Sequence, residues 1–142
     1  MASSILYIHT VLVLVVVLLL PAPALQAETE PCPPGFEHYA EYRMFFGRGK
    51  PGGGTVSDGE WRDFLAAEVT PRFPDGLTVV DAGGQWRDSK GAVGREGAKL
   101  LLVLAEPGPD AVRRTEEIAE AYKRAFDQQS VLRAVETVCA AF

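Results

Sequence analysis

Apolar and polar side chains alternate from His38 to Gly47, a pattern typical of a β-strand with one buried face. Residues 77–82 begin a second strand that we expect to continue to Trp86-Arg87, and residues 130–139 show the same two-residue period as 38–47. Residues 99–105 form an almost continuous apolar run, as expected of a strand at the centre of a sheet. The chain therefore predicts four strands.

Two segments repeat their apolar side chains every three or four residues and predict helices. Ser57 and Glu60 form a capping box at the start of the first helix, which we expect to end before Pro71. Asp110 is placed to cap the second. The apolar stripe of that second helix consists of Val112, Thr115, Ile118, Ala119, Tyr122 and Phe126.

The connections between these elements complete the topology. The pair Gly83-Gly84 predicts a bulge or bend in the second strand, and residues 88–91 predict a hairpin turn. The resulting order, β-α-β-β-α-β, is that of ferredoxin-like α+β folds: a four-stranded antiparallel sheet with two helices on one face. In that arrangement the first and last strands are antiparallel neighbours.

Residues 1–27 contain no charged side chain and include the apolar core Val11–Leu20, which is too short to span a bilayer comfortably. We interpret residues 1–27 as a signal peptide cleaved after Ala27; cleavage after Ala24 is the alternative site. The protein is then secreted or periplasmic and free of the membrane. Because no Lys or Arg precedes the apolar core, a retained N-terminal membrane anchor is the alternative.

The rest of the chain has the size of one domain. The whole sequence has 142 residues, of which 14 are basic and 19 acidic, giving a net charge of −5. An acidic chain without a basic run is not a typical nucleic-acid binder. We expect an irregular lead-in at 28–37 and a single domain at 38–142.

Both cysteines, Cys32 and Cys139, follow the leader. An even count in an exported protein favours a disulfide, and the topology brings together the ends of the first and last strands where these residues lie. His38 is the one histidine outside the leader. We interpret it as a solvated or capping side chain, with catalysis as the alternative, and we expect no metal site.

The string Gly47-x-Gly49-x-x-Gly52 matches the dinucleotide fingerprint, but Pro51 and further glycines follow it and no helix begins there. We therefore interpret the segment as a loop and expect no cofactor. Six side chains are candidates for positioning a small ligand of unknown identity: Tyr42, Arg43, Trp61, Arg72, Gln85 and Trp86. Their alternative roles are core packing for Trp61, a carbonyl cap for Arg72 and hairpin packing for Trp86.

The uncovered face of the sheet is predicted to mix charged and apolar side chains. By strand alternation it carries Glu41, Arg43, Lys99 and Arg133 beside Tyr39, Phe45, Leu101, Val103, Val131 and Val135. So much apolar area on a free face favours a homodimer or a ligand cavity. On this assignment, Val103→Asp is expected to dissociate the dimer and leave the fold intact.

Several segments together resemble a known family. They are Trp61-x-x-Phe64, residues 70–79 (Thr-Pro-Arg-Phe-Pro-Asp-Gly-Leu-Thr-Val), residues 84–88 (Gly-Gln-Trp-Arg-Asp), and Arg95-Glu96 before Lys99. With these motifs the chain, from about Tyr42 to its C-terminus, resembles the exported bacterial domain-of-unknown-function family 3574 (DUF3574). It departs from the familiar pattern in a longer Gly-rich loop and at Gly97-Ala98. The resemblance implies an exported domain unit and no known activity.

Two functions follow from these patterns. The first is an exported, non-catalytic binding or structural module that self-associates through its open sheet face. The alternative is a small cofactor-independent enzyme of the dimeric α+β barrel type, with Tyr42, Arg43, Trp61, Gln85 and Trp86 around a cavity between sheet and helices. A packed interior favours the module, and a closed pocket with converging polar groups favours the enzyme.

Overall fold

Four antiparallel strands form one sheet in the order β2-β3-β1-β4. Their bounds are β1 Glu37–Gly47, β2 Thr78–Arg87, β3 Val93–Ala105 and β4 Leu132–Ala140. The computed structural model describes residues 30–87 and 91–142. The predicted signal peptide and most of the predicted turn at 88–91 lie outside the described residues. Within the described part, no helix is long and apolar enough to cross a membrane.

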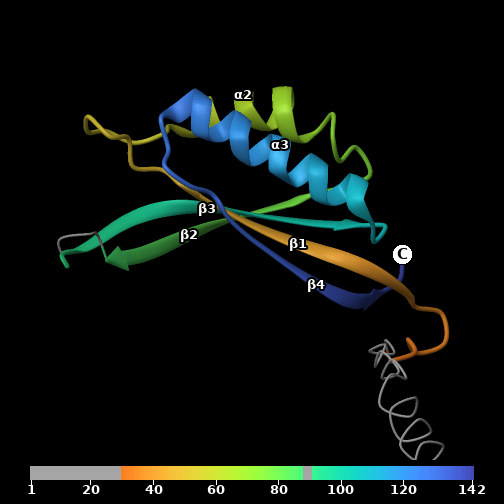
Figure 1. Ribbon diagram of the computed structural model, residues 1–142. Coiled ribbons are helices and arrows are strands. Elements are labelled where there is room, and N and C mark those ends of the chain that lie inside the picture. Colours follow the sequence, from red (N-terminus) through yellow and green to blue (C-terminus); the bar gives the residue numbers. More distant parts are fainter. Residues whose placement is uncertain (1–29, 88–90) are drawn as a thin grey trace, which may run out of the picture. The chain divides into compact units, whose positions relative to one another are not determined.

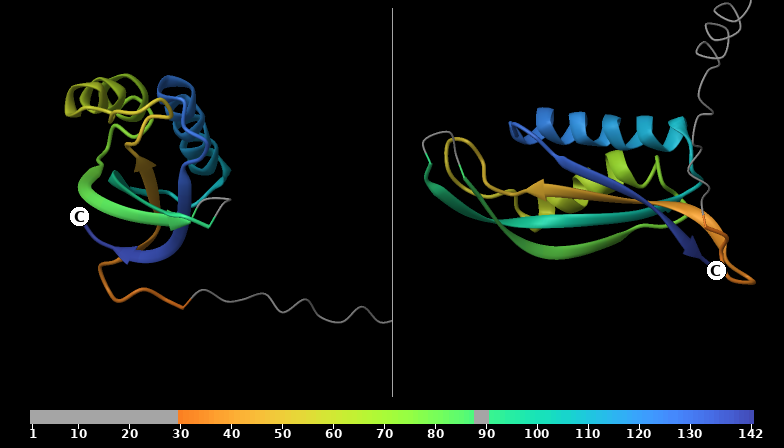
Figure 2. Two further views of the ribbon diagram at one scale, coloured as in Figure 1. Left: turned by 90° about the vertical axis from the view of Figure 1, so that its left-hand side faces the viewer. Right: turned by 60° about the horizontal axis from the view of Figure 1, so that its bottom comes forward.

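Two helical segments cover the same face of this sheet (Figure 1). Helix α2 (Asp58–Phe64) continues into a π-helical turn, η1 (Leu65–Val69), and α3 spans Pro109–Phe126. Figure 2 shows both helical segments on one side of the sheet and no helix of the described residues on the other. The element order and the sheet order are those of the predicted ferredoxin-like α+β fold. Residues Cys32–Phe142 make up one compact unit.

The two helices begin differently. Ser57 caps α2 with the predicted capping box, in which its side chain accepts from the Glu60 N–H and the Glu60 carboxylate accepts from the Ser57 N–H. The predicted cap of the second helix is wrong by two residues. Gly108 is the N-cap of α3, because Pro109 suits the first turn, where no backbone donor is needed. Asp110 lies inside that turn and pairs with Arg113 and Arg114.

The first helical segment ends just before Pro71, as predicted, but its last turn is wider than an α-helix. The N–H of Thr70 donates to the carbonyl of Leu65, five residues back, over 2.9 Å. Pro71 has no N–H with which to continue the helix. The wide turn still buries Val69 against the sheet, so the apolar stripe begun by Trp61 and Phe64 is kept.

The β2–β3 hairpin is longer and more regular than predicted. Register runs unbroken from Thr78 opposite Leu102 to Arg87 opposite Val93, so Gly83-Gly84 makes no bulge. Strand β3 begins at Val93, six residues before the apolar run, because its Gly-rich first half pairs with the end of β2. The hairpin curves away beyond the helices (Figure 1).

The core lies between the sheet and the helices. Strand residues Met44, Phe46, Leu101 and Val103 pack there against helical residues. Five rings pack together with centroids 4.7–6.0 Å apart: Phe46, Trp61, Phe64, Tyr122 and Phe126. The space between the two layers is thus filled with side chains.

Register corrects the predicted composition of the uncovered face. On β1 the prediction is right, but Lys99 pairs with Phe46 and Val103 pairs with Tyr42, so the odd-numbered residues of β3 face the helices. Val135 also pairs with Tyr42, which turns Arg133 and Val135 toward the helix side. The apolar run at 99–105 has no alternation to mark its faces, so one wrong choice reversed the whole strand.

Candidate functional site

The uncovered sheet face is a broad apolar surface, which we call the open sheet face. Cross-strand register places side chains from all four strands on it, among them Val80 and Ala82 from β2; Leu100, Leu102 and Leu104 from β3; Tyr39, Glu41, Arg43 and Phe45 from β1; and Leu132, Ala134, Glu136 and Val138 from β4. Val80 is 43% exposed and Leu132 63% exposed. No second layer of the described residues covers this face (Figure 2).

Three charged side chains lie together among the apolar ones. Arg43 sits on a central strand, and its Nε is 2.8 Å from the Glu41 carboxylate. The same guanidinium pairs with Glu136, which lies directly opposite Glu41 in the β1–β4 register. The face therefore carries a positive charge between two negative ones, within a surface of leucine, valine and phenylalanine.

The six predicted ligand-positioning residues occupy separate parts of the molecule. Tyr42 and Trp61 are buried, 4% and 3% exposed, in the interior. Arg43 lies on the open sheet face, because it alternates with Tyr42 along β1. Gln85 and Trp86 lie on opposite faces of the hairpin; Gln85 accepts from Arg95, and Trp86 packs over Gly94 with 54% exposure.

Arg72, the sixth candidate, joins the end of η1 to α3. Its Nη1 donates to the Glu68 carbonyl over 2.7 Å, and its Nε donates to Glu117 over 3.1 Å. The hydrogen bond from Arg72 is the main reason why the pKa of Glu117 lies below its usual value, and Arg113 adds to it. These contacts correspond to the alternative role as a carbonyl cap.

The Gly-rich loop after β1 closes around a carboxylate. The N–H of Gly49 donates to Glu96 over 2.8 Å. A Cβ added at Gly47 or Gly49 would lie 2.9 or 2.8 Å from that carboxylate, so the glycines make room for it. Gln128 and Tyr122 also donate to the carbonyls of Gly49 and Gly47. The glycines that resemble a dinucleotide fingerprint thus surround the Glu96 carboxylate of the protein itself.

Lys99 is a buried cation near this loop. Its Nζ lies 2.5 Å from Asp81 and 3.1 Å from Asp58. The hydrogen bond that Lys99 donates to the Asp81 carboxylate raises the pKa of Lys99 above its usual value. The contact with Lys99 in turn lowers the pKa of Asp58. Lys99 is therefore held protonated and links β3 to β2 and to the start of α2.

A shallow groove of about 370 Å³ runs between the two helical segments. Its floor consists of alanine and phenylalanine side chains, and carboxylates line its rim. Glu60 on this rim pairs with Lys50, and Glu68 pairs with Arg72. Most of the rim charge is thus neutralised within the molecule.

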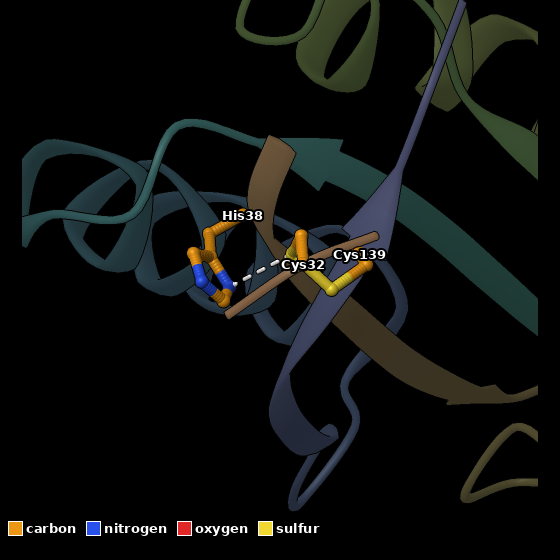
Figure 3. Close-up of side chains that lie close together, drawn as sticks. All are labelled: Cys32, His38 and Cys139. Carbon is orange, nitrogen blue, oxygen red and sulfur yellow. Dashed lines mark hydrogen bonds between the residues drawn. A yellow bond between two sulfur atoms is a disulfide. The ribbon is translucent and has the colours of Figure 1, made fainter. Parts of the chain in front are cut away.

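The predicted disulfide is confirmed: Cys32 and Cys139 are bonded, with Cα atoms 5.6 Å apart. Sequence reasoning missed the position of His38. This residue lies directly opposite Cys139 in the β1–β4 register, and its Nδ1 is 3.3 Å from Cys32 Sγ (Figure 3). This position could have been predicted, because the first and last strands are neighbours. The topology that places Cys139 beside Cys32 also places Cys139 beside His38.

The chain matches the family described as "Protein of unknown function (DUF3574)" over residues 41–142. No curated protein matches it. A phage SAM lyase in complex with S-methyl-5'-thioadenosine is similar in structure, with a TM-score of 0.57 at 14% identity over 82% of this chain and 97% of that one. The apo phage SAM lyase gives 0.50 at 16% identity, covering 81% of this chain and 98% of that one.

A third similar structure, CutA from Synechococcus elongatus, has a TM-score of 0.49 at 10% identity, covering 73% of this chain and 80% of that one. At 14% and 16% identity, the two phage SAM lyase structures are related to this chain through the fold alone.

Proposed function

Since the chain belongs to DUF3574, a family of proteins of unknown function, its role has to be inferred from its own surfaces, and we propose an exported module that self-associates through the open sheet face. The observation that carries the proposal is the exposed apolar surface around Arg43. Large apolar patches on an exported domain mark places where another surface docks.

A second copy of the chain suits this face in charge and in size. Two-fold pairing sets each face against itself, so Arg43 of one copy can meet Glu41 or Glu136 of the other. The β1–β3 ladder pairs eight residues of β1, Ala40 through Gly47, and the sheet is four strands wide. At about 3.4 Å per residue and about 4.8 Å per strand, a rectangle of this length and width covers roughly 500 Å² per copy. Two such footprints reach the roughly 1,000 Å² that a specific interface needs.

The packed interior favours this module over the enzyme of the α+β barrel type. Trp61 and Tyr42, two of the residues expected around a central cavity, are buried among core side chains. The shallow groove of about 370 Å³ between the helical segments and a surface pocket of about 430 Å³ beside the end of β4 lie elsewhere. The disulfide also supports export, because such bonds persist in oxidising compartments.

The test of self-association is Leu100→Asp. Leu100 lies on the open sheet face opposite Phe45 and Val80, so an aspartate there buries an unpaired charge in the proposed interface. We expect the wild type to sediment as a dimer and the variant to dissociate with an affinity loss of about 100-fold or more, with an unchanged far-ultraviolet circular dichroism spectrum.

Two variants serve as controls for this test. Val112→Asp adds the same charge at a 47% exposed valine of α3 and is expected to leave the dimer intact. Val103→Asp, which the sequence pattern suggested for this test, is expected to unfold the protein instead, since Val103 is 2% exposed in the core. A wild type that stays monomeric at its highest soluble concentration would refute self-association.

Export has its own test. We propose that residues 1–27 are removed, so N-terminal sequencing of the secreted protein is expected to begin at or near Glu28. A secreted or membrane-bound protein that still reads from Met1 would instead show that the leader is retained as an anchor.

A further inference from the structure

Three side chains with good metal-ligand atoms meet at the end of the β1–β4 ladder. They are Cys32, His38 and Cys139, and their two sulfur atoms and one imidazole nitrogen all lie within 4.8 Å of one another (Figure 3). Two sulfurs and one imidazole are ligands that soft and borderline cations select. In the oxidised protein the two sulfurs are bonded to each other, so thiolate ligands are absent.

The backbone positions two of the three ligands independently of the disulfide. His38 and Cys139 face each other within a ladder of nine cross-strand pairs that extends from Glu37 to Phe45 on β1. Cys32 lies on the lead-in, which a turn closes where the Phe36 N–H donates to the Pro33 carbonyl over 3.0 Å. Reduction therefore frees the two sulfurs beside an imidazole that the sheet keeps in place.

The disulfide is accessible to a reductant from one side. Cys139 is exposed, whereas Cys32 and His38 are half-buried. A thiolate of an external dithiol attacks Cys139 Sγ, the S–S bond breaks, and Cys32 Sγ leaves with the bonding electrons. The second thiolate of the reductant then displaces Cys139 Sγ and closes the reductant's own disulfide. Two electrons and two protons pass to the protein, which now carries two thiols.

We propose that the reduced protein binds one thiophilic metal ion through Cys32 Sγ, Cys139 Sγ and His38 Nδ1. Both thiols lose their protons on binding, and the ion takes the place of the covalent bond between the two strand ends. Both Zn²⁺ and Cu⁺ accept two thiolates and one imidazole as ligands. For Zn²⁺ a water molecule completes a four-coordinate site, whereas Cu⁺ accepts the three protein ligands alone. This inference does not rest on self-association.

The experiment compares the oxidised and reduced forms of the chain without its leader. The protein is reduced with dithiothreitol, separated from the reductant under anaerobic conditions, and titrated with Zn²⁺, with Cu⁺, and with Co²⁺ as a spectroscopic probe. Native mass spectrometry is expected to show one ion per reduced chain and none per oxidised chain. Co²⁺ is expected to give a thiolate-to-metal charge-transfer band in the near ultraviolet.

Variants distinguish this site from two adventitious thiols. His38→Gln keeps both cysteines, and we expect it to bind the metal at least about 10-fold more weakly. Loss of a residue that merely hydrogen-bonds to a metal ligand already lowers metal affinity by about that factor. Cys32→Ser and Cys139→Ser are each expected to lose the charge-transfer band. Glu37→Gln, next to the histidine and exposed, is the matched control and is expected to bind like the wild type.

The outcomes separate clearly. A reduced, folded protein that binds neither Zn²⁺ nor Cu⁺, or a His38→Gln variant that binds as tightly as the wild type, would overturn the proposal. If reduction loosens the fold, the strand signal in circular dichroism is measured before and after the metal is added. A metal that bridges the strand ends is expected to restore that signal, and no recovery would overturn the proposal. Equal binding to the urea-unfolded chain would overturn the site.

Discussion

Tyr122 shows how one side chain joins the core to the Gly-rich loop. It is fully buried, and its hydroxyl donates to the Gly47 carbonyl over 2.9 Å. Burial raises the pKa of Tyr122 to about 12, because the phenolate would lose its hydration inside the ring cluster. The folded protein therefore keeps this phenol protonated at a pH where the unfolded chain begins to ionise it.

This pKa predicts a loss of stability in alkali. The contribution of Tyr122 is fully present below its ordinary pKa of 10.0 and is lost as the pH rises toward about 12. Tyr122→Phe is expected to cost about 1 kcal/mol near neutral pH, from the lost hydrogen bond, and to flatten the alkaline decline. Urea unfolding at about pH 8 and about pH 11 measures both effects. An equally steep decline in Tyr122→Phe, with Tyr39→Phe as the control, would refute the assignment.

At the level of single residues, sequence reasoning identified side chains whose partners are local. Ser57 and Glu60 are three positions apart, and their capping box follows from the helix geometry. Glu96 could not be found in this way, because its partner Gly49 is 47 positions distant. Lys99 was placed on the wrong face, because the apolar run that it begins does not show which side is buried, and its partners Asp58 and Asp81 lie on other elements.

At the scale of elements, the start of α2 depends on the charge of Glu60. Contact with Lys50, together with donors from Ser57, lowers the pKa of Glu60 to about 2. The stabilisation that this carboxylate provides is therefore complete above its ordinary pKa of 4.5 and is lost as the pH falls toward about 2.

We expect Glu60→Gln to reduce the acid dependence of unfolding, and Ser57→Ala to cost about 1 kcal/mol at neutral pH through the lost cap. Thermal unfolding followed by circular dichroism between about pH 2 and about pH 6 measures the first effect. Asp63→Asn is the matched control on the same helix, as no ion pair ties Asp63 within the described part of the chain. An acid dependence equal to that of the wild type in Glu60→Gln would contradict the role of Glu60.

Elements with strong periodicity were predictable, and their faces were predictable only where the pattern alternates. Strand β1 alternates throughout, and its two faces are as predicted. Strand β3 combines a Gly-rich first half with an unbroken apolar second half, so neither its start at Val93 nor its faces could be inferred. Which side chains of such a strand are buried depends on its register with the neighbouring strands, and that register cannot be read from one sequence.

At the scale of the whole molecule, the disulfide links positions 107 residues apart and is expected to be a major source of stability. Replacing both Cys32 and Cys139 by serine is expected to lower the free energy of unfolding by about 2–5 kcal/mol, because the unfolded chain regains the freedom of a long loop. Urea unfolding of the variant and the wild type, with and without reductant, measures the difference. A wild type with free thiols after denaturation without reductant would contradict the bond.

The same bond determines how the protein responds to mechanical tension. Cys32 precedes β1, and Cys139 lies near the end of β4, so the bond encloses both helices and nearly the whole sheet. A pull applied to the chain outside the two cysteines passes from one sulfur to the other and bypasses the hydrogen bonds of the sheet. The oxidised domain thus bears load as a short covalent link, and only after reduction does the same force peel β4 away from β1.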